Sequence, residues 1–196
     1  MTVATMTRDL RRPGGAVLPT LLVLLLLAVG LVAGWLLRTA AESATSTIER
    51  GGITMDVPAG WLIEPASGDL LLLATDPTAP DSRVSVARIP AEGRSLADVA
   101  AEQDQASAGL FESYRVISQG PVRFAGKEGH EVRFALVDSS RGDPVPRVIE
   151  GLDEYIAAGD AVLRISIEAH SGELESVLPA FYRFAESITQ RAGTGS

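Results

Sequence analysis

The sequence predicts an α+β protein in which one long apolar helix precedes a single α/β sandwich, with a twisted, mainly antiparallel sheet covered by helices. Three observations support this fold class. A run without any charge extends from Ala16 to Leu37, several later segments alternate between apolar and polar residues, and two segments have apolar residues at helical spacing. Strands, a helix, more strands and a closing helix form the order expected for helices packed on a largely antiparallel sheet.

The apolar run at 16–37 predicts a transmembrane helix, because a helix rises about 1.5 Å per residue and a bilayer core is about 30 Å thick. Arginines are denser before the run than after it. This bias predicts a cytoplasmic tail at 1–15 and an extracytoplasmic C-terminal domain, on a plasma membrane that is crossed once. The alternative is a cleaved signal peptide that ends near Ala40, but the apolar region of such a peptide normally has only about 7 to 15 residues.

Residues 38–52 are small and polar, so they predict a flexible tether between the membrane and one domain at 53–189. Residues 190–196 are predicted to form a disordered tail. The chain has no cysteine, which excludes disulfides, thiolate metal sites and a lipid-modified amino terminus. Its net charge of −8 disfavours nucleic acid as a partner and favours basic partners or cations, although simple solubility explains an acidic surface equally well.

The first half of the domain is predicted to contain short strands and then a helix. Strands are expected at 53–57, 62–63, 70–75 and 82–89. The run at 70–75 is continuously apolar, so we expect a central strand that is covered on both faces. Ser95 and Asp98 have the spacing of a capping box, which predicts a helix from Leu96 to about Ala108.

The second half is predicted to contain antiparallel strands that end in an amphipathic helix. Strands are expected at 114–118, 121–124, 130–137, 147–157 and 161–169. Apolar residues at helical spacing from Leu174 to Ile188 predict a final helix whose large apolar face packs on the sheet. Pro179 lies in the first turn of this helix or bends it.

The segment ITMDVPAGW at 53–61 resembles the opening motif of the PsbP-like superfamily, the fold of the photosystem II extrinsic subunit and of Ran-binding nuclear import factors. The helix that starts after Ser95, the hairpin glycines Gly126 and Gly129, and the last helix are similar as well, so the resemblance spans about residues 53–188. It implies a binding or accessory protein, and it supplies no reaction.

The two histidines do not belong to a recognisable catalytic motif. His130 and His170 lie near the ends of predicted strands, and a metal site would require them to converge with carboxylates such as Glu131 or Glu173. Exposed strand-end residues are the simpler interpretation. The sequence contains neither a Gly-x-Ser-x-Gly elbow nor a phosphate-binding loop. We therefore expect no catalytic residues, no metal and no cofactor, and we do not expect an enzyme.

Glu150, Asp153 and Glu154 form the most notable polar group, and they are a candidate acidic face for docking a partner. Strand alternation places Glu150 and Glu154 on one face of the sheet and Asp153 on the other, together with Tyr155. The spacing differs from that of a calcium-binding loop, and a solvated sheet face is the simpler interpretation.

These observations favour a membrane-anchored extracytoplasmic binding or accessory protein that docks on, or assists assembly of, a membrane protein complex. Its expected partners are the bilayer and a protein of that complex. Gly30 and Gly34 are a candidate helix–helix contact, because small residues four apart allow close approach. The alternative is a carrier or sensor of a small apolar or lipidic ligand, which requires an open cavity between sheet and helix, whereas a close-packed interior favours docking.

Overall fold

The computed structural model describes residues 17–42, 45–111, 113–124, 126–139 and 146–190. The chain divides into two compact units, with the boundary between Ala44 and Thr45. The first unit contains the apolar segment and the second contains the sheet.

Helix α1 (Val17–Glu42) covers most of the helix predicted at 16–37 and continues into the predicted tether. Its large apolar side chains between Leu21 and Trp35 are 54 to 75% exposed. Among the described residues, no helix combines the length and the apolar character that a membrane crossing requires. The transmembrane helix therefore stays a prediction, and the tail predicted at 1–15 lies outside the described residues.

The second unit is built from strands and two helices. Their order is β1 (Thr45–Arg50), β2 (Ile53–Pro58), β3 (Leu62–Ile63), β4 (Leu70–Asp76), β5 (Ala79–Pro90), α2 (Leu96–Leu110), β6 (Arg115–Phe124), β7 (Lys127–Asp138), β8 (Arg147–Ala158), β9 (Ala161–His170), α3 (Leu174–Ser187) and β10 (Thr189–Gln190). The strands and helices expected from the sequence are all present, and the strands expected at 114–118 and 121–124 are one strand, β6, with an irregular register after Val116.

The strands form two antiparallel sheets. The larger sheet has seven strands in the order β3-β4-β5-β9-β8-β7-β6, and the smaller has the order β1-β2-β10. The prediction that 70–75 would be the central strand is wrong, because β9 holds that position and β4 is second from the edge. Leu72 and Ala74 of β4 are fully buried, whereas Leu73 and Thr75, which alternate with them, are only half-buried, so one face of this strand is closed and the other is partly open.

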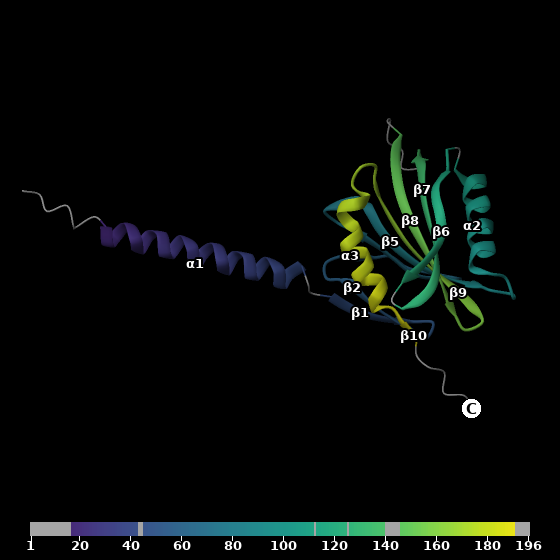
Figure 1. The fold of residues 1–196 in the computed structure, drawn as a ribbon, viewed down its shortest axis with the longest axis horizontal. Helices are drawn as coiled ribbons and strands as arrows, with labels where there is room; N and C mark the ends of the chain where they lie inside the picture. Colours follow the sequence, from purple (N-terminus) through teal and green to yellow (C-terminus); the bar gives the residue numbers. More distant parts are fainter. Residues whose placement is uncertain (1–16, 43–44, 112, 125, 140–145, 191–196) are drawn as a thin grey trace, which may run out of the picture. The chain divides into compact units, whose positions relative to one another are not determined.

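Helices cover both faces of the seven-stranded sheet (Figure 1). On one face α2 packs against β6, β7 and β8, and the capping box predicted at Ser95 and Asp98 is present at its start. On the other face α3 packs against β9 and β2. The main core fills the space between the sheet, β2 and α3, and its largest buried side chains include Phe181, Met55, Leu152 and Ile165.

The tether predicted at 38–52 is not one flexible segment. Residues 38–42 continue α1, and Thr45–Arg50 form β1, which pairs with β2 along its whole length. The side chains of β1 are mostly exposed and polar, so the apolar alternation typical of a half-buried strand is missing. The pairing of β1 with β2 therefore decides its structure. At the other end, Gln190 pairs with Ile53, so the first residue of the predicted tail belongs to β10, and 191–196 lie outside the described residues.

Candidate functional site

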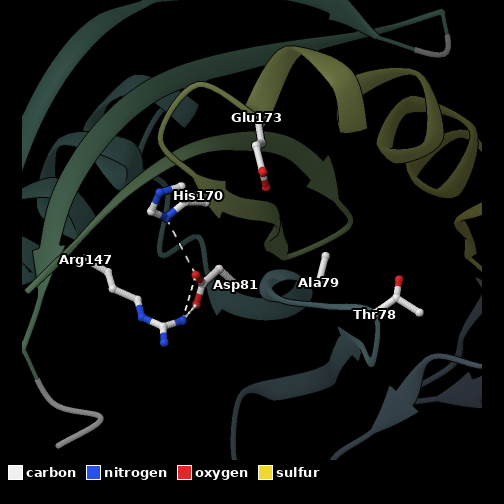
Figure 2. A pocket seen from close by; sticks show the side chains of 6 residues that line it. All are labelled: Thr78, Ala79, Asp81, Arg147, His170 and Glu173. Carbon is white, nitrogen blue, oxygen red and sulfur yellow. Dashed lines mark hydrogen bonds and ion pairs between the residues drawn. The ribbon is translucent and has the colours of Figure 1, made fainter. Parts of the chain in front are cut away.

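A pocket of about 400 Å³, lined mainly by polar and charged residues, lies at one end of the inner strands of the seven-stranded sheet (Figure 2). Its lining residues are Thr78, Ala79, Asp81, Arg147, His170 and Glu173. Because β5, β9 and β8 are antiparallel neighbours, the start of β5, the end of β9 and the start of β8 lie side by side at this end of the sheet. The chain then turns from β9 into α3, which places Glu173 above the strand ends. We call this site the rim pocket.

Asp81 is the anchored carboxylate of the rim pocket. Nη1 of Arg147 donates to both of its oxygens at 2.9 Å, and Nδ1 of His170 lies 3.7 Å from Oδ2. The Asp81 side chain is only 14% exposed, whereas the side chains of Arg147 and His170 are 37% and 48% exposed. Arg147 therefore compensates the charge of Asp81 at the base of the pocket.

Glu173 is the second carboxylate of the rim pocket, and it has a different environment. Its backbone N–H donates to the carbonyl of His170, while its side chain does not cap α3 and has no ion-pair partner among the described residues. Figure 2 shows the side chain extending from the start of α3 over the pocket. The pocket thus offers an uncompensated carboxylate beside an anchored ion pair, which suits a lysine or arginine side chain from outside.

The arrangement of His170 and Asp81 does not amount to a general base held by an acid. A separation of 3.7 Å is too long for a hydrogen bond, and Asp81 already accepts two bonds from Arg147. The neighbouring hydroxyls are engaged as well, since Ser171 Oγ donates to Glu150 and Thr78 Oγ1 donates to Asp76, both at 2.7 Å. The described part of the chain also places no group of three or more histidine or carboxylate side chains where they could hold a metal ion. The geometry of the pocket suits binding.

The predicted acidic face does not exist as an exposed surface. Glu150 is half-buried, Asp153 is 5% exposed and Glu154 is fully buried. They divide between the two faces as alternation predicts, since the hydroxyls of Tyr155 and Ser166 donate to Asp153 on the α2 face. β8 lies between β9 and β7 with a helix layer on each side, so its polar residues are enclosed. Burial raises the pKa of Asp153, and Arg164 and the Ser166 hydroxyl act in the opposite direction.

Two further predicted residues, Gly30 and Gly34, lie in α1. A Cβ added at either position would meet nothing within 4 Å in this chain, so their role in a helix–helix contact stays a prediction.

Sequence reasoning missed Asp81 and Arg147, and it considered His170 and Glu173 only as conditional metal ligands. All four are polar residues at the start or end of a strand or at the start of a helix. Polar residues in such positions are the sequence signal that could have identified the pocket. That signal becomes useful only once the strand order β5-β9-β8 is known, and local periodicity does not determine strand order.

At the level of sequence, no protein-family model matches the chain, and no curated protein matches it either. Solved structures do match. Cyanobacterial PsbP (CyanoP) from Synechocystis sp. PCC 6803 is 16% identical, with 76% of this chain and 93% of that chain covered and a TM-score of 0.57. The Ran-binding protein Mog1p of Saccharomyces cerevisiae is 12% identical, with 75% and 95% covered and a TM-score of 0.50.

This chain has the PsbP-like/Mog1 fold. The match confirms the resemblance that the segment at 53–61 predicted. In the structure this PsbP-like motif forms the corner between the two sheets, because β2 belongs to the smaller sheet and β3 to the larger. Gly60 adopts a φ of 89°, a conformation that side-chain-bearing residues rarely take, and the N–H of Trp61 donates to the carbonyl of Pro58. The Trp61 side chain then packs against the main core.

Proposed function

We propose that this protein is an extracytoplasmic binding or accessory protein that docks on a membrane protein complex through the rim pocket. The observation that carries the proposal is the uncompensated carboxylate of Glu173 beside the anchored Asp81–Arg147 pair. A basic side chain of the partner would enter the pocket and pair with Glu173, and the net charge of −8 would favour its approach. Mog1p is a Ran-binding protein, so this fold serves protein recognition there.

Membrane association is the second part of the proposal. The large apolar side chains of α1 between Leu21 and Trp35 are exposed within this chain, and a bilayer would remove them from water. The arginines that precede this segment in the sequence favour a cytoplasmic N-terminus and an extracytoplasmic domain. Carbonate extraction of membranes and protease treatment of intact cells test both points. A chain that leaves the membrane in carbonate would contradict the anchor, and a domain that stays protected from external protease after any outer membrane has been permeabilised would contradict the extracytoplasmic location.

The carrier alternative has less support from the interior. A lipidic or other apolar ligand would need space between the sheet and α3, where Phe181, Phe184 and Leu152 are at most 3% exposed and pack in the main core. The rim pocket carries the charged side chains of Asp81, Arg147 and Glu173 and lies at the ends of β5, β9 and β8, which suits a charged side chain better than an apolar ligand.

The docking proposal is tested by affinity purification of the full-length chain from its own membranes in mild detergent. The unmodified chain is compared with Glu173→Lys, and the matched control is Glu186→Lys, which reverses an exposed carboxylate on the same helix. We expect the same membrane-complex subunits to co-purify with the unmodified chain and the control, and to be reduced at least 10-fold with Glu173→Lys, equivalent to about 1.4 kcal/mol.

Equal recovery with all three chains would contradict docking through the rim pocket. If no complex subunit is recovered but a lipid remains bound, the carrier alternative replaces the accessory role.

A further inference from the structure

Glu154 is a buried carboxyl group that the rim pocket does not use. It lies on β8 between Leu152 and Ile156, and its side chain is on the sheet face that α3 covers. The residue is 0% exposed, and neither Oε1 nor Oε2 has a hydrogen-bond partner within the described part of the chain. An ionised carboxylate in this position would have lost its water without gaining a donor, which is strongly unfavourable.

The charged groups around Glu154 add to this effect. Glu131 of β7 is its direct cross-strand partner, so two carboxyl groups are side by side, and Ile165 opposite it on β9 is apolar. Arg133 is the nearby cation, but its Nε lies 3.4 Å from Glu131 Oε1 and its Nη1 donates to Glu175 Oε1 at 2.7 Å. Arg133 thus serves two other carboxylates and donates nothing to Glu154.

From α3, Tyr182 is the titratable side chain that faces this group. Burial raises its pKa, and the charges of Glu131 and Glu154 raise it further, which places the three side chains close to one another. Glu175, which Arg133 binds, is the α3 carboxylate linked to this group, and it is largely exposed, as are Arg183 and Glu186 of the same helix. No group from α3 therefore supplies a positive charge or a hydrogen bond to Glu154 within the described residues.

Helix α3 is the element that would separate from the sheet when Glu154 ionises. It has no side-chain hydrogen bond at its N-cap, and Pro179 inside it removes one backbone donor. Its stability consequently depends on the packing of Phe181 and Phe184 against the sheet.

We propose that Glu154 is a proton-dependent lock on α3: the helix stays seated on the sheet while this carboxyl group is protonated, and it opens when the group ionises and draws in water. The lock is independent of what the rim pocket binds. It is a conformational device of the domain itself, built from a buried carboxyl group, a like-charged cross-strand neighbour and a weakly capped helix.

The direction of the pH dependence follows from linkage. Burial, and then the charge of Glu131, raises the pKa of Glu154 from 4.5 to about 7. In an open or unfolded state the group loses its proton near the ordinary value, whereas the closed state keeps it to near neutral pH. The closed state is thus favoured at acidic pH, loses stability as pH rises from about 4.5 to about 7, and loses little more above that range.

Hydrogen exchange of the α3 amides, measured on the full-length chain in mild detergent at pH 5.5 and 8.5, tests the lock. After correction for the intrinsic pH dependence of exchange, we expect the opening constant of α3 to rise by about 10-fold or more in the unmodified chain. Glu154→Gln, which imitates the protonated group, should show no such rise, and its opening constant should lie below that of the unmodified chain at both pH values, because the unmodified chain already begins to lose stability above about pH 4.5. Glu128→Gln is the matched control on β7, because this carboxylate is exposed, and it should behave like the unmodified chain.

An opening constant that does not change with pH in the unmodified chain would overturn the proposal, and so would an equal rise in Glu154→Gln. If Glu154→Gln does not fold, the same measurement on Glu131→Gln tests the lock, because this variant retains Glu154 and removes the neighbouring charge. The lock requires a smaller rise in this variant, and a rise equal to that of the unmodified chain contradicts it.

Discussion

At Gly151 the sheet has no room for a side chain, because the ring of Phe134 lies over this position. The two residues are cross-strand partners on β8 and β7, and a Cβ at 151 would lie 2.2 Å from Phe134 Cζ. Phe134 also stacks on Tyr114, with ring centroids 5.3 Å apart, so the ring cannot move without disturbing a second aromatic residue. The glycine is therefore a packing requirement of the α2 face.

We predict that Gly151→Ala lowers the free energy of unfolding by about 1–3 kcal/mol, because the new methyl group displaces the Phe134 ring. Urea unfolding measures the change. Gly120→Ala on β6 is the control, since a Cβ there meets nothing within 4 Å, and we expect a change within about 0.5 kcal/mol. Equal unfolding midpoints for the two variants would contradict the assigned contact.

The buried polar residues of β8 are also residue-scale features that differ from the sequence expectation. Among the described residues, Asp153 has hydrogen-bond donors and Glu154 has none, although they are neighbours in the chain and both are buried. Strand alternation determines that the two side chains face opposite helix layers. The side chains present in each layer then determine whether the carboxyl group has a hydrogen-bond donor. This contrast is why the proton-dependent lock is assigned to Glu154.

Helix α2 shows how much of an element local sequence can specify. Ser95 Oγ accepts a hydrogen bond from the N–H of Asp98, and the Asp98 carboxylate accepts one from the N–H of Ser95. Val99 and Ala100 are the fully buried residues of the helix, and they pack against the sheet. The Ser95 hydrogen bonds hold the pKa of Asp98 below its usual range, so the capping box is complete at neutral pH and weakens when Asp98 is protonated in acid.

We predict that Ser95→Ala lowers the free energy of unfolding by about 0.5–2 kcal/mol, because the first turn of α2 loses its cap. Urea unfolding at neutral pH checks this value. Ser107→Ala, within the same helix, is the matched variant and should be neutral or slightly stabilising, since alanine has the higher helix propensity. A loss of stability at Ser107 as large as that at Ser95 would show that capping is not the cause.

At the scale of the whole molecule, the folded unit begins earlier than its apolar pattern indicates. β1 pairs with β2, and β2 in turn places Ile53, Met55 and Val57 in the main core against α3. Without β1, the edge of β2 would present unpaired backbone groups to solvent.

We therefore predict that a chain starting at Thr45 folds with a higher melting temperature than a chain starting at Gly52. The shorter chain should also associate through the exposed edge of β2. Thermal unfolding and size-exclusion chromatography of the two chains make the comparison. Identical melting temperatures and monomeric elution of both chains would mean that β1 contributes nothing to the domain.

Sequence alone determined the elements whose signal is local. The capping box of α2, the strand alternation of β5 and β7, the apolar face of α3 and the PsbP-like corner at 53–61 all depend on residues close together in the chain, so their physics can be recognised there. The apolar segment at 16–37 is equally local, and its membrane role stays a prediction.

Only the tertiary structure decided the features that depend on strand order. Polar β1 becomes a strand because β2 is beside it, β4 lies near the edge because β9 takes the centre, and Asp81, Arg147, His170 and Glu173 meet because β5, β9 and β8 are neighbours. The acidic residues of β8 are buried for the same reason. Local sequence specifies which way a side chain points along a strand, whereas the neighbouring strands and helices specify what it meets.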